Sequence, residues 1–332
     1  MIRSTKLRGA LLLSALSLST LSAAQNSPPR LQQPPAAPAA QATDDDTFKL
    51  PSVDVELVQI PVSVTSKDGK LIDNLPQSSF QLLEDNVVQT IKLFAHEDIP
   101  LSLGLVIDNS GSMRNKKQRV NAAALNFVRD SNPEDETFIV EFADDAQLIQ
   151  QFTRSMSALL ESIGTYQGGV GTAMYDAVYL SLDHIKHGTR DKKALLVITD
   201  GEDMDSKYGL NALLDHIKES KNITIFAIGI LEENDDRGGL FSPSPSKKAK
   251  ADLKKIAELS GGEAYFPKTV EEVAGICKTI AHDLRNQYTL GYSPKNTKND
   301  GGYRTVSVRV TPPDGKAKPT VRAKPGYTAP GP

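Results

Sequence analysis

The chain has 332 residues, enough for two domains at the usual size of about 100–200 residues each. Its 38 lysines and arginines nearly balance 41 aspartates and glutamates, and the net charge of −3 argues against a nucleic-acid-binding protein, which normally carries a basic surplus. The one cysteine, Cys277, excludes an intrachain disulfide and any zinc or iron–sulfur site built from cysteines.

Residues 1–24 have the pattern of a secretory signal peptide. Basic residues precede an apolar stretch at 9–21, and small residues end at Ala24, after which we expect cleavage. The apolar stretch is shorter than the ~20 residues that span a bilayer, so we expect a periplasmic or secreted protein without a transmembrane segment. Residues 25–46, rich in Gln, Pro and Ala, are expected to form an extended, disordered linker.

Two segments, 47–97 and 288–328, have the alternating apolar pattern of β-strands. Strands are predicted at 53–64, 80–83, 87–94, 288–292, 303–310 and 320–323. Asn86 suits a hairpin turn between the second and third of these strands, because asparagine accepts positive φ. Each segment alone is too small for a stable core, so we expect the two to pair in one β-sandwich-like module.

The central residues, 98–287, follow a different pattern. Near-continuous apolar runs, typical of strands covered on both faces, occur at 101–107, 137–143, 194–199 and 223–230. Apolar residues at helical spacing predict helices around 120–128 and 270–284. This alternation predicts an α/β fold with a doubly wound, mostly parallel sheet and helices on both faces, in which ligands bind beyond the carboxyl ends of the strands.

Oxygen-bearing side chains follow these predicted strands. They are Asp108, Ser110 and Ser112 after the first run, Asp200 after the third, and Thr172 after a glycine-rich segment. Five oxygen donors with only two negative charges suit Mg²⁺, with Mn²⁺ or Ca²⁺ as alternatives, and do not suit zinc or copper. The sequence therefore predicts a site for a hard divalent cation at this edge of the sheet.

These five side chains resemble the metal-ion-dependent adhesion site of von Willebrand factor type A domains. The motif reads Asp108-x-Ser110-x-Ser112, then Thr172, then Asp200-Gly201. The resemblance covers about 100–287, and both flanks are similar to those of acidobacterial secreted proteins related to this family. It implies a protein-binding module and not an enzyme, whose cation keeps one position open for an Asp or Glu carboxylate of a partner protein. The sequence leaves the partner and the oligomeric state open.

Two other functions are alternatives to this one. A metal-free exported scaffold would use acidic and hydroxyl side chains only as helix caps, as Ser110 and Asp203 could do individually, although caps do not require donors at three strand ends. A metal-dependent phosphohydrolase would use Asp108 as its nucleophile, but Ser110 stands where such chemistry usually needs a second aspartate.

Three residues of reactive types are expected to have no special role. His184 and His187 are three residues apart in a helical stretch, but no third ligand is spaced to join them, so we expect a solvated helix face. Cys277 falls on the apolar stripe of its helix and is predicted to be a small buried hydrophobe.

Charged residues near the predicted site can also be explained without a specific function. An exposed helix surface is expected for Lys116, Lys117 and Arg119. Either a rim of the metal site or a solvated acidic loop is expected for Glu202, Asp203 and Asp205. A mobile loop is predicted at 232–250, from its glycine and Ser-Pro pairs, and its role is left open.

Overall fold

A computed structural model of the chain describes residues 57–96, 98–231, 244–313 and 318–332. The predicted signal peptide and linker, 1–46, and most of the predicted loop at 232–250 lie outside the described residues. The described residues all belong to one compact unit that starts at Asp54. None of the helices in this described part of the chain combines the length and the apolar character that a bilayer span requires.

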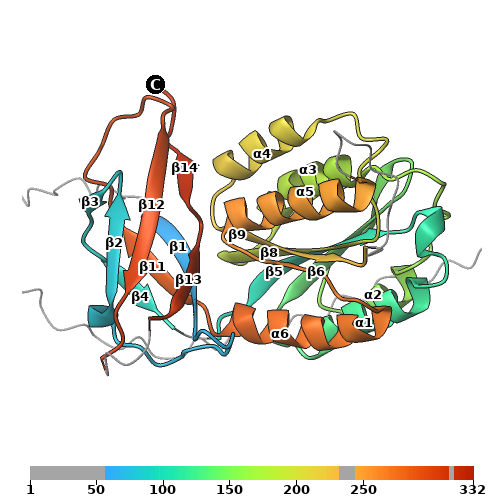
Figure 1. Ribbon diagram of the computed structural model, residues 1–332, viewed down its shortest axis with the longest axis horizontal. Coiled ribbons are helices and arrows are strands. Elements are labelled where there is room, and N and C mark those ends of the chain that lie inside the picture. Colours follow the sequence, from blue (N-terminus) through green and yellow to red (C-terminus); the bar gives the residue numbers. More distant parts are fainter. Residues whose placement is uncertain (1–56, 97, 232–243, 314–317) are drawn as a thin grey trace, which may run out of the picture. The chain divides into compact units, whose positions relative to one another are not determined.

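A six-stranded sheet forms the centre of the chain, in the order β10-β9-β8-β5-β6-β7 (Figure 1). Its strands are β5 Leu101–Asp108, β6 Glu136–Phe142, β7 Ala146–Thr153, β8 Lys192–Thr199, β9 Ile223–Gly229 and β10 Ala264–Tyr265. All neighbouring strands in it pair in parallel except β7, which pairs antiparallel with β6 at one edge. Every residue of β5 is buried, because structure covers both faces of the sheet there.

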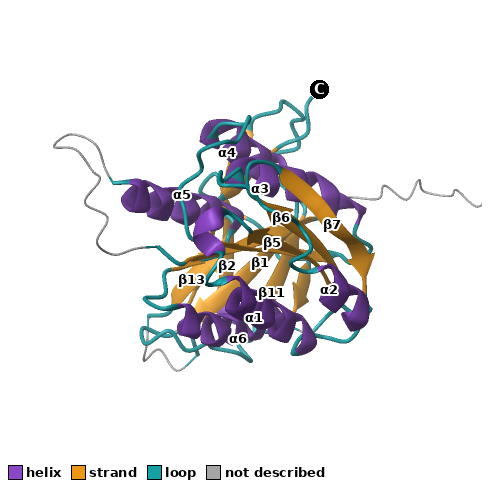
Figure 2. Cartoon of the chain, turned by 90° about the vertical axis from the view of Figure 1, so that its right-hand side faces the viewer, coloured by secondary structure: helices purple, strands orange, loops and turns teal. Residues whose placement is uncertain are grey.

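Helices cover both faces of this sheet (Figures 1 and 2). One face carries α1 Lys117–Arg129, α2 Met156–Ser162 and α6 Val273–Arg285, and the other carries α3 Met174–His184, α4 Leu210–Glu219 and α5 Pro245–Ser260. Short 3₁₀ helices lie at Gln77–Ser79, Gly111–Met113, Ile185–His187 and Val270–Glu272. Phe127 and Ile280 pack on one face of the sheet and Val178 and Leu213 on the other. The predicted doubly wound α/β fold is confirmed.

The two flanking segments form two four-stranded sheets with the orders β13-β1-β11-β4 and β14-β12-β2-β3. Their strands are β1 Val58–Thr65, β2 Phe80–Glu84, β3 Val87–Val88, β4 Leu93–Ala95, β11 Tyr288–Tyr292, β12 Tyr303–Val310, β13 Thr320–Ala323 and β14 Gly326–Thr328. β1 pairs antiparallel with β11 and β13, so strands of the two segments alternate in the first sheet, and β2 pairs with β12, so the two segments meet at one strand pair in the second. Ile60, Leu82 and Tyr288 share one core, which neither segment could enclose alone.

The hairpin between β2 and β3 forms as its turn residues predict, but the prediction of a single strand at 87–94 is wrong. Asp85 and Asn86 have φ of 47° and 64°, the left-handed region that a two-residue turn between twisted strands requires. The strand predicted at 87–94 is in fact two strands, because the chain leaves one sheet after Val88 and joins the other at Leu93. An apolar run does not reveal such a change of sheet.

The predicted C-terminal boundary of the loop at 232–250 is also wrong, because α5 begins at Pro245. Ser244 occupies the N-cap position and Pro245 the first helical position, where proline's fixed φ is compatible with a helix and its missing N–H is not needed. The Ser-Pro pair therefore marks a helix start here and not the middle of a loop.

Candidate metal centre

The carboxyl ends of β5 and β8 lie side by side and place Asp108 and Asp200 at the same edge of the sheet. Parallel pairing aligns the two strands up to Ile107 and Ile198. Asp108 is the last residue of β5, and Asp200 follows the end of β8 directly. Two carboxylates that are far apart in the sequence thus come from adjacent strand ends, as expected for this type of sheet.

A chain of hydrogen bonds links the serines to these carboxylates. The backbone N–H of Ser110 donates to Oδ1 of Asp108 at 2.8 Å. The hydroxyls of Ser110 and Ser112 are 3.1 Å apart, and the Ser112 hydroxyl donates to Oδ1 of Asp200 at 2.7 Å. The tight turn after β5 therefore presents both hydroxyls on the side that faces Asp200.

Asp108 is almost completely buried, with 1% of its residue surface exposed. Its second oxygen, Oδ2, accepts a hydrogen bond of 2.6 Å from the Thr199 hydroxyl. Burial raises the pKa of Asp108, while hydrogen bonds from Ser110 and Thr199 lower it and the charge of Asp200 raises it further. A cation beside this carboxyl would favour its charged form.

Thr172 reaches the same place from a glycine-rich loop. Its backbone N–H donates to Oδ2 of Asp205 at 2.8 Å, and its carbonyl accepts from the backbone N–H of Met204 at 2.9 Å. The Thr172 hydroxyl oxygen faces the turn after β8, because a Cβ added to Gly201 would lie 3.7 Å from it. All five predicted ligands thus lie around the ends of β5 and β8.

Two aspartates outside the motif hold this loop in place. Asp144, after β6, accepts a 2.6 Å hydrogen bond from the backbone N–H of Gly171. A Cβ at Gly171 would lie 2.2 Å from an oxygen of Asp205, and one at Gly168 would lie 2.0 Å from the carbonyl oxygen of Asn109. At Gly168 the neighbour is backbone, so only glycine permits this approach, whereas a side chain at Gly171 would require the Asp205 carboxylate to move.

The other acidic residues after β8 have structural partners and are not a solvated loop. Asp203 accepts hydrogen bonds from the backbone N–H of Tyr175, at the start of α3, at 2.9 Å and from the Ser206 hydroxyl at 2.5 Å. Glu202 pairs with Lys248 of α5. Sequence alone left the role of these residues open because their partners lie in distant segments.

The sequence predicted that Lys116 lies on an exposed helix surface, and this prediction is wrong. Nζ of Lys116 lies 2.5 Å from Oδ2 of Asp200, and the two side chains are 27% and 0% exposed. The neighbouring Lys117 donates to the carbonyl of Gly164 at 3.1 Å, while Arg119 pairs with Glu271 on the surface. The sequence gives no signal for the Lys116 contact except that this residue follows Ser112 by one helical turn.

Among the reactive residues, Cys277 agrees with its prediction and His184 does not. Cys277 is buried in the core, and burial raises the pKa of its thiol to about 12. His184 is not on a solvated face, because its ring stacks on Phe152 with centroids 5.2 Å apart and contacts the edge of Phe138. Burial lowers the pKa of His184, so this side chain packs as a neutral ring.

The oxygen donors at the strand ends fit a hard divalent cation. Neighbouring ligands of an octahedral Mg²⁺, each ~2.0–2.1 Å from the ion, lie about 2.9 Å apart. The oxygens that link Ser110, Ser112 and Asp200 are hydrogen-bonded at 3.1 and 2.7 Å, separations that an octahedral ion could take over without a large movement of these side chains. In the described ranges no group of three or more His, Cys, Asp or Glu side chains is arranged to hold a metal, so a site here depends on the hydroxyls.

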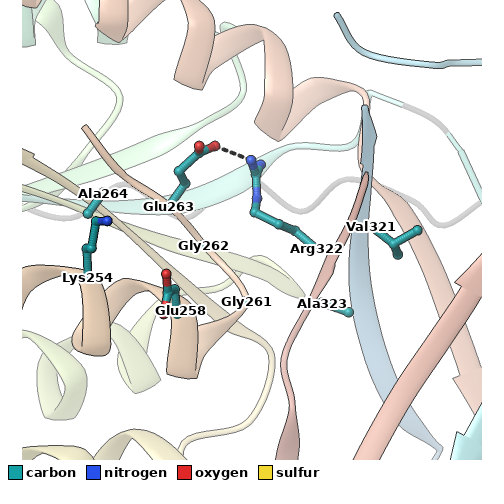
Figure 3. A pocket seen from close by; sticks show the side chains of 9 residues that line it. All are labelled: Lys254, Glu258, Gly261, Gly262, Glu263, Ala264, Val321, Arg322 and Ala323. Atoms are coloured by element: carbon teal, nitrogen blue, oxygen red, sulfur yellow. Dashed lines mark hydrogen bonds and ion pairs between the residues drawn. The ribbon is translucent and has the colours of Figure 1, made fainter. Parts of the chain in front are cut away.

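A hollow of about 410 Å³ lies away from the strand ends, between α5, β10 and β13. Figure 3 shows Arg322 of β13 pointing from its strand toward Glu263, with which it forms an ion pair. Arg322 also pairs with Asp283 of α6, and Lys324 donates to the carbonyl of Ile217 at the end of α4. This hollow therefore marks the junction at which the last strands of the chain are joined to the α/β domain.

A family profile for the von Willebrand factor type A domain matches residues 103–202. The centre of this chain is a von Willebrand factor type A domain. The matched segment contains all five oxygen donors described above. Domains of this family commonly mediate protein–protein adhesion, and they often bind a divalent metal at their adhesion site.

Related sequences match only part of the chain. The uncharacterized protein sll0103 of Synechocystis sp. is 25% identical over 177 residues, which cover 52% of this chain and 41% of the relative. Inter alpha-trypsin inhibitor heavy chain 4 of Mus musculus is 23% identical over 154 residues, 41% of this chain and 16% of the relative. The chain thus spans less than half the length of these relatives.

Solved structures of von Willebrand factor type A domains are similar at low identity. One from Catenulispora acidiphila has a TM-score of 0.47 and 14% identity, with 84% of this chain and 75% of that one covered. Proximal thread matrix protein 1 from the mussel byssus, solved with a zinc-occupied adhesion motif, has a TM-score of 0.47 and 15% identity, with coverage of 60% and 49%.

Proposed function

We propose that this chain is an exported protein-binding module in which Mg²⁺ joins the domain to an acidic side chain of a partner protein. The ion would be held by Asp108, Ser110, Ser112, Thr172 and Asp200. The observation that carries the proposal is the run of closely spaced oxygens from Ser110 to Asp200 beside a buried carboxylate. When bound, the ion supplies the positive charge that attracts the carboxylate of the partner.

The charge balance of the donor set supports an anionic partner. Asp108 and Asp200 supply two negative charges, and the three hydroxyl ligands supply none. A divalent ion in this set is less screened than in a cage of carboxylates and keeps its attraction for a further anion. A protein carboxylate matches that requirement, whereas an amide of the same shape would lose the charge-assisted interaction.

Two exposed apolar side chains beside the site indicate what surrounds that carboxylate. Val170, two residues before Thr172, is 90% exposed, and Met204, whose backbone bonds to Thr172, is 77% exposed. Apolar side chains next to a charged centre are typical of contact surfaces, where they exclude water from the polar contact. We therefore propose a partner whose acidic residue is flanked by apolar side chains.

The role of Asp108 argues against the enzymatic alternative. A phosphohydrolase would need this carboxylate to attack phosphorus, but both of its oxygens accept hydrogen bonds and it is buried. We accordingly propose a binding protein and not an enzyme. Absence of metal-dependent turnover of a generic phosphate ester is the result expected from this proposal.

Chelation provides the direct test of the metal-dependent contact. A partner is captured by pull-down with the mature chain in Mg²⁺, and its dissociation constant is then measured in Mg²⁺ and in EDTA. We expect EDTA to weaken binding by at least about tenfold to a hundredfold, because interactions with charged groups contribute ~1.5–3 kcal/mol. Equal constants under both conditions would show that the partner binds elsewhere and that the proposal is wrong.

The apolar rim, Val170 and Met204, gives an independent prediction. The double variant Val170→Ser/Met204→Ser should bind the same partner about tenfold or more weakly, since burying such side chains contributes ~1.5–3 kcal/mol each. Its affinity for Mg²⁺, measured by isothermal titration, should not change. Val87→Ser, at an exposed valine of β3, is the matched control. Equal partner affinity in the rim variant and in this control would remove these side chains from the interface.

A further inference from the structure

We infer that Lys116 is a built-in competitor for the divalent cation, a tethered ammonium group that occupies Asp200 until a metal ion displaces it. This inference concerns the regulation of the proposed metal site and rests on that proposal. Its starting point is the 2.5 Å contact between Nζ of Lys116 and Oδ2 of Asp200.

The Asp200 carboxylate needs a positive partner because its side chain is completely buried. An ionised carboxylate removed from water is strongly destabilising unless it is paired and hydrogen-bonded. Ser112 donates to one oxygen and Lys116 to the other, so both oxygens are used in the described structure. The ammonium group thus supplies at Asp200 the charge that a metal ion would supply.

Lys116 and a divalent ion cannot both keep this position without strong repulsion. Each would lie within a few ångströms of the same buried carboxylate, where like charges are poorly screened. Binding of the metal therefore requires the ammonium group to move away. The side chain can do so, because it is 27% exposed and lysine has a flexible four-carbon stem that reaches solvent.

The location of Lys116 in the chain makes its release easier. It occupies the N-cap position of α1, makes no side-chain capping hydrogen bond, and no acidic residue is present in the first turn. The positive end of the helix dipole lies there, and it disfavours a cation. The ion pair with Asp200 therefore keeps Lys116 at a position that the helix dipole disfavours for a cation. When a metal ion replaces this ion pair, the dipole favours movement of the ammonium group into solvent.

Competition from Lys116 therefore makes the affinity of the site for a metal ion lower than its oxygen ligands alone would give. Lys116→Gln removes the competing charge and should bind Mg²⁺ about tenfold more tightly than the parent, or about 1.4 kcal/mol. Lys116→Arg keeps a positive charge and should bind like the parent. Arg119→Gln is the matched control, because Arg119 lies on the same helix but pairs with exposed Glu271.

The experiment is isothermal titration of Mg²⁺ alone into the full mature chain, its Lys116→Gln, Lys116→Arg and Arg119→Gln variants. Arg119→Gln should change the affinity by less than about twofold, since a distant surface charge is screened by salt.

Thermal unfolding with and without Mg²⁺ gives a second measurement. Without metal, Lys116→Gln should melt below the parent, because Asp200 loses its partner, and Mg²⁺ should raise its melting temperature by more than it raises that of the parent.

Each outcome separates the inference from the proposed function. If the parent binds Mg²⁺ and Lys116→Gln binds it no more tightly, the competitor role is overturned while the metal site stands. An equal gain in Arg119→Gln would overturn it as well, because the effect would then be one of net charge. Binding by Lys116→Gln alone would support the competition between lysine and ion, but it would contradict displacement in the parent and the metal-dependent function. If neither protein binds a divalent ion, both the inference and the metal-dependent function are wrong.

Discussion

Replacing Asp108 by asparagine is expected to abolish measurable Mg²⁺ binding. Asparagine keeps the size of the side chain and its acceptor for the Ser110 N–H, so the buried position should tolerate it. It removes one of the two negative charges of the donor set, and we expect a loss beyond the ~10–100-fold that second-shell changes produce. Isothermal titration with Mg²⁺, and circular dichroism to verify the fold, provide the measurement.

Asp215→Asn is the control for this loss of charge. Asp215 lies on α4, where it pairs with Lys218 and is 66% exposed. This variant should bind Mg²⁺ like the parent. If Asp108→Asn also binds Mg²⁺ like the parent, the assignment of the metal centre to these strand ends is wrong.

Replacing Arg322 by methionine should lower the free energy of unfolding by about 3 kcal/mol or more at neutral pH, because it leaves the buried carboxylate of Asp283 without its partner. Asp283 has a side chain only 4% exposed, and burial raises its pKa although Arg322 opposes the shift. Without the arginine this pKa should rise further. A carboxyl group whose folded pKa is raised destabilises the protein once the pH exceeds its unfolded pKa, and the penalty is complete above the folded pKa.

The loss should therefore shrink as the pH falls through the raised pKa of Asp283, which urea unfolding at neutral and mildly acidic pH can show. The double variant Arg322→Met/Asp283→Asn should recover part of the lost stability at neutral pH, because the buried charge of Asp283 is removed together with that of Arg322. Arg309→Met, at an exposed arginine of β12, should have little effect. A loss that is the same at every pH would show that Arg322 acts through packing alone.

The central strands and the candidate ligands could be predicted because both depend on local patterns. Runs buried on both faces mark β5, β6, β8 and β9, and the polar residues after them must meet where parallel strands end. β7 was not predicted because it lies at the sheet edge, where its partly exposed residues do not form a clear apolar run. β14, only three residues long, was missed for lack of length.

What the sequence did not reveal depends on contacts between distant residues. Lys116 meets Asp200 at a separation of 84 positions, and Asp205 meets the Thr172 backbone at 33. The periodicity of apolar residues in the sequence does not predict which charged side chains of the loops at one edge of a sheet become partners. The same limit applies to the division of 87–94, because only the pairing of Leu93 with Gly291 shows that the chain has changed sheets.

The pairing of both ends of the chain in one sandwich imposes an order on its folding during synthesis. β1 lies between β11 and β13 in its sheet, so both of its edges must wait for strands made much later. Tyr292 and Glu84, which hydrogen-bond in the shared core, are 208 positions apart. At ~5–20 residues per second, the ribosome needs about 10–40 s to cover that distance. For that time β1 has neither of its partner strands, and β2 has only the short β3 beside it, so the nascent chain exposes strand edges that can mispair or aggregate.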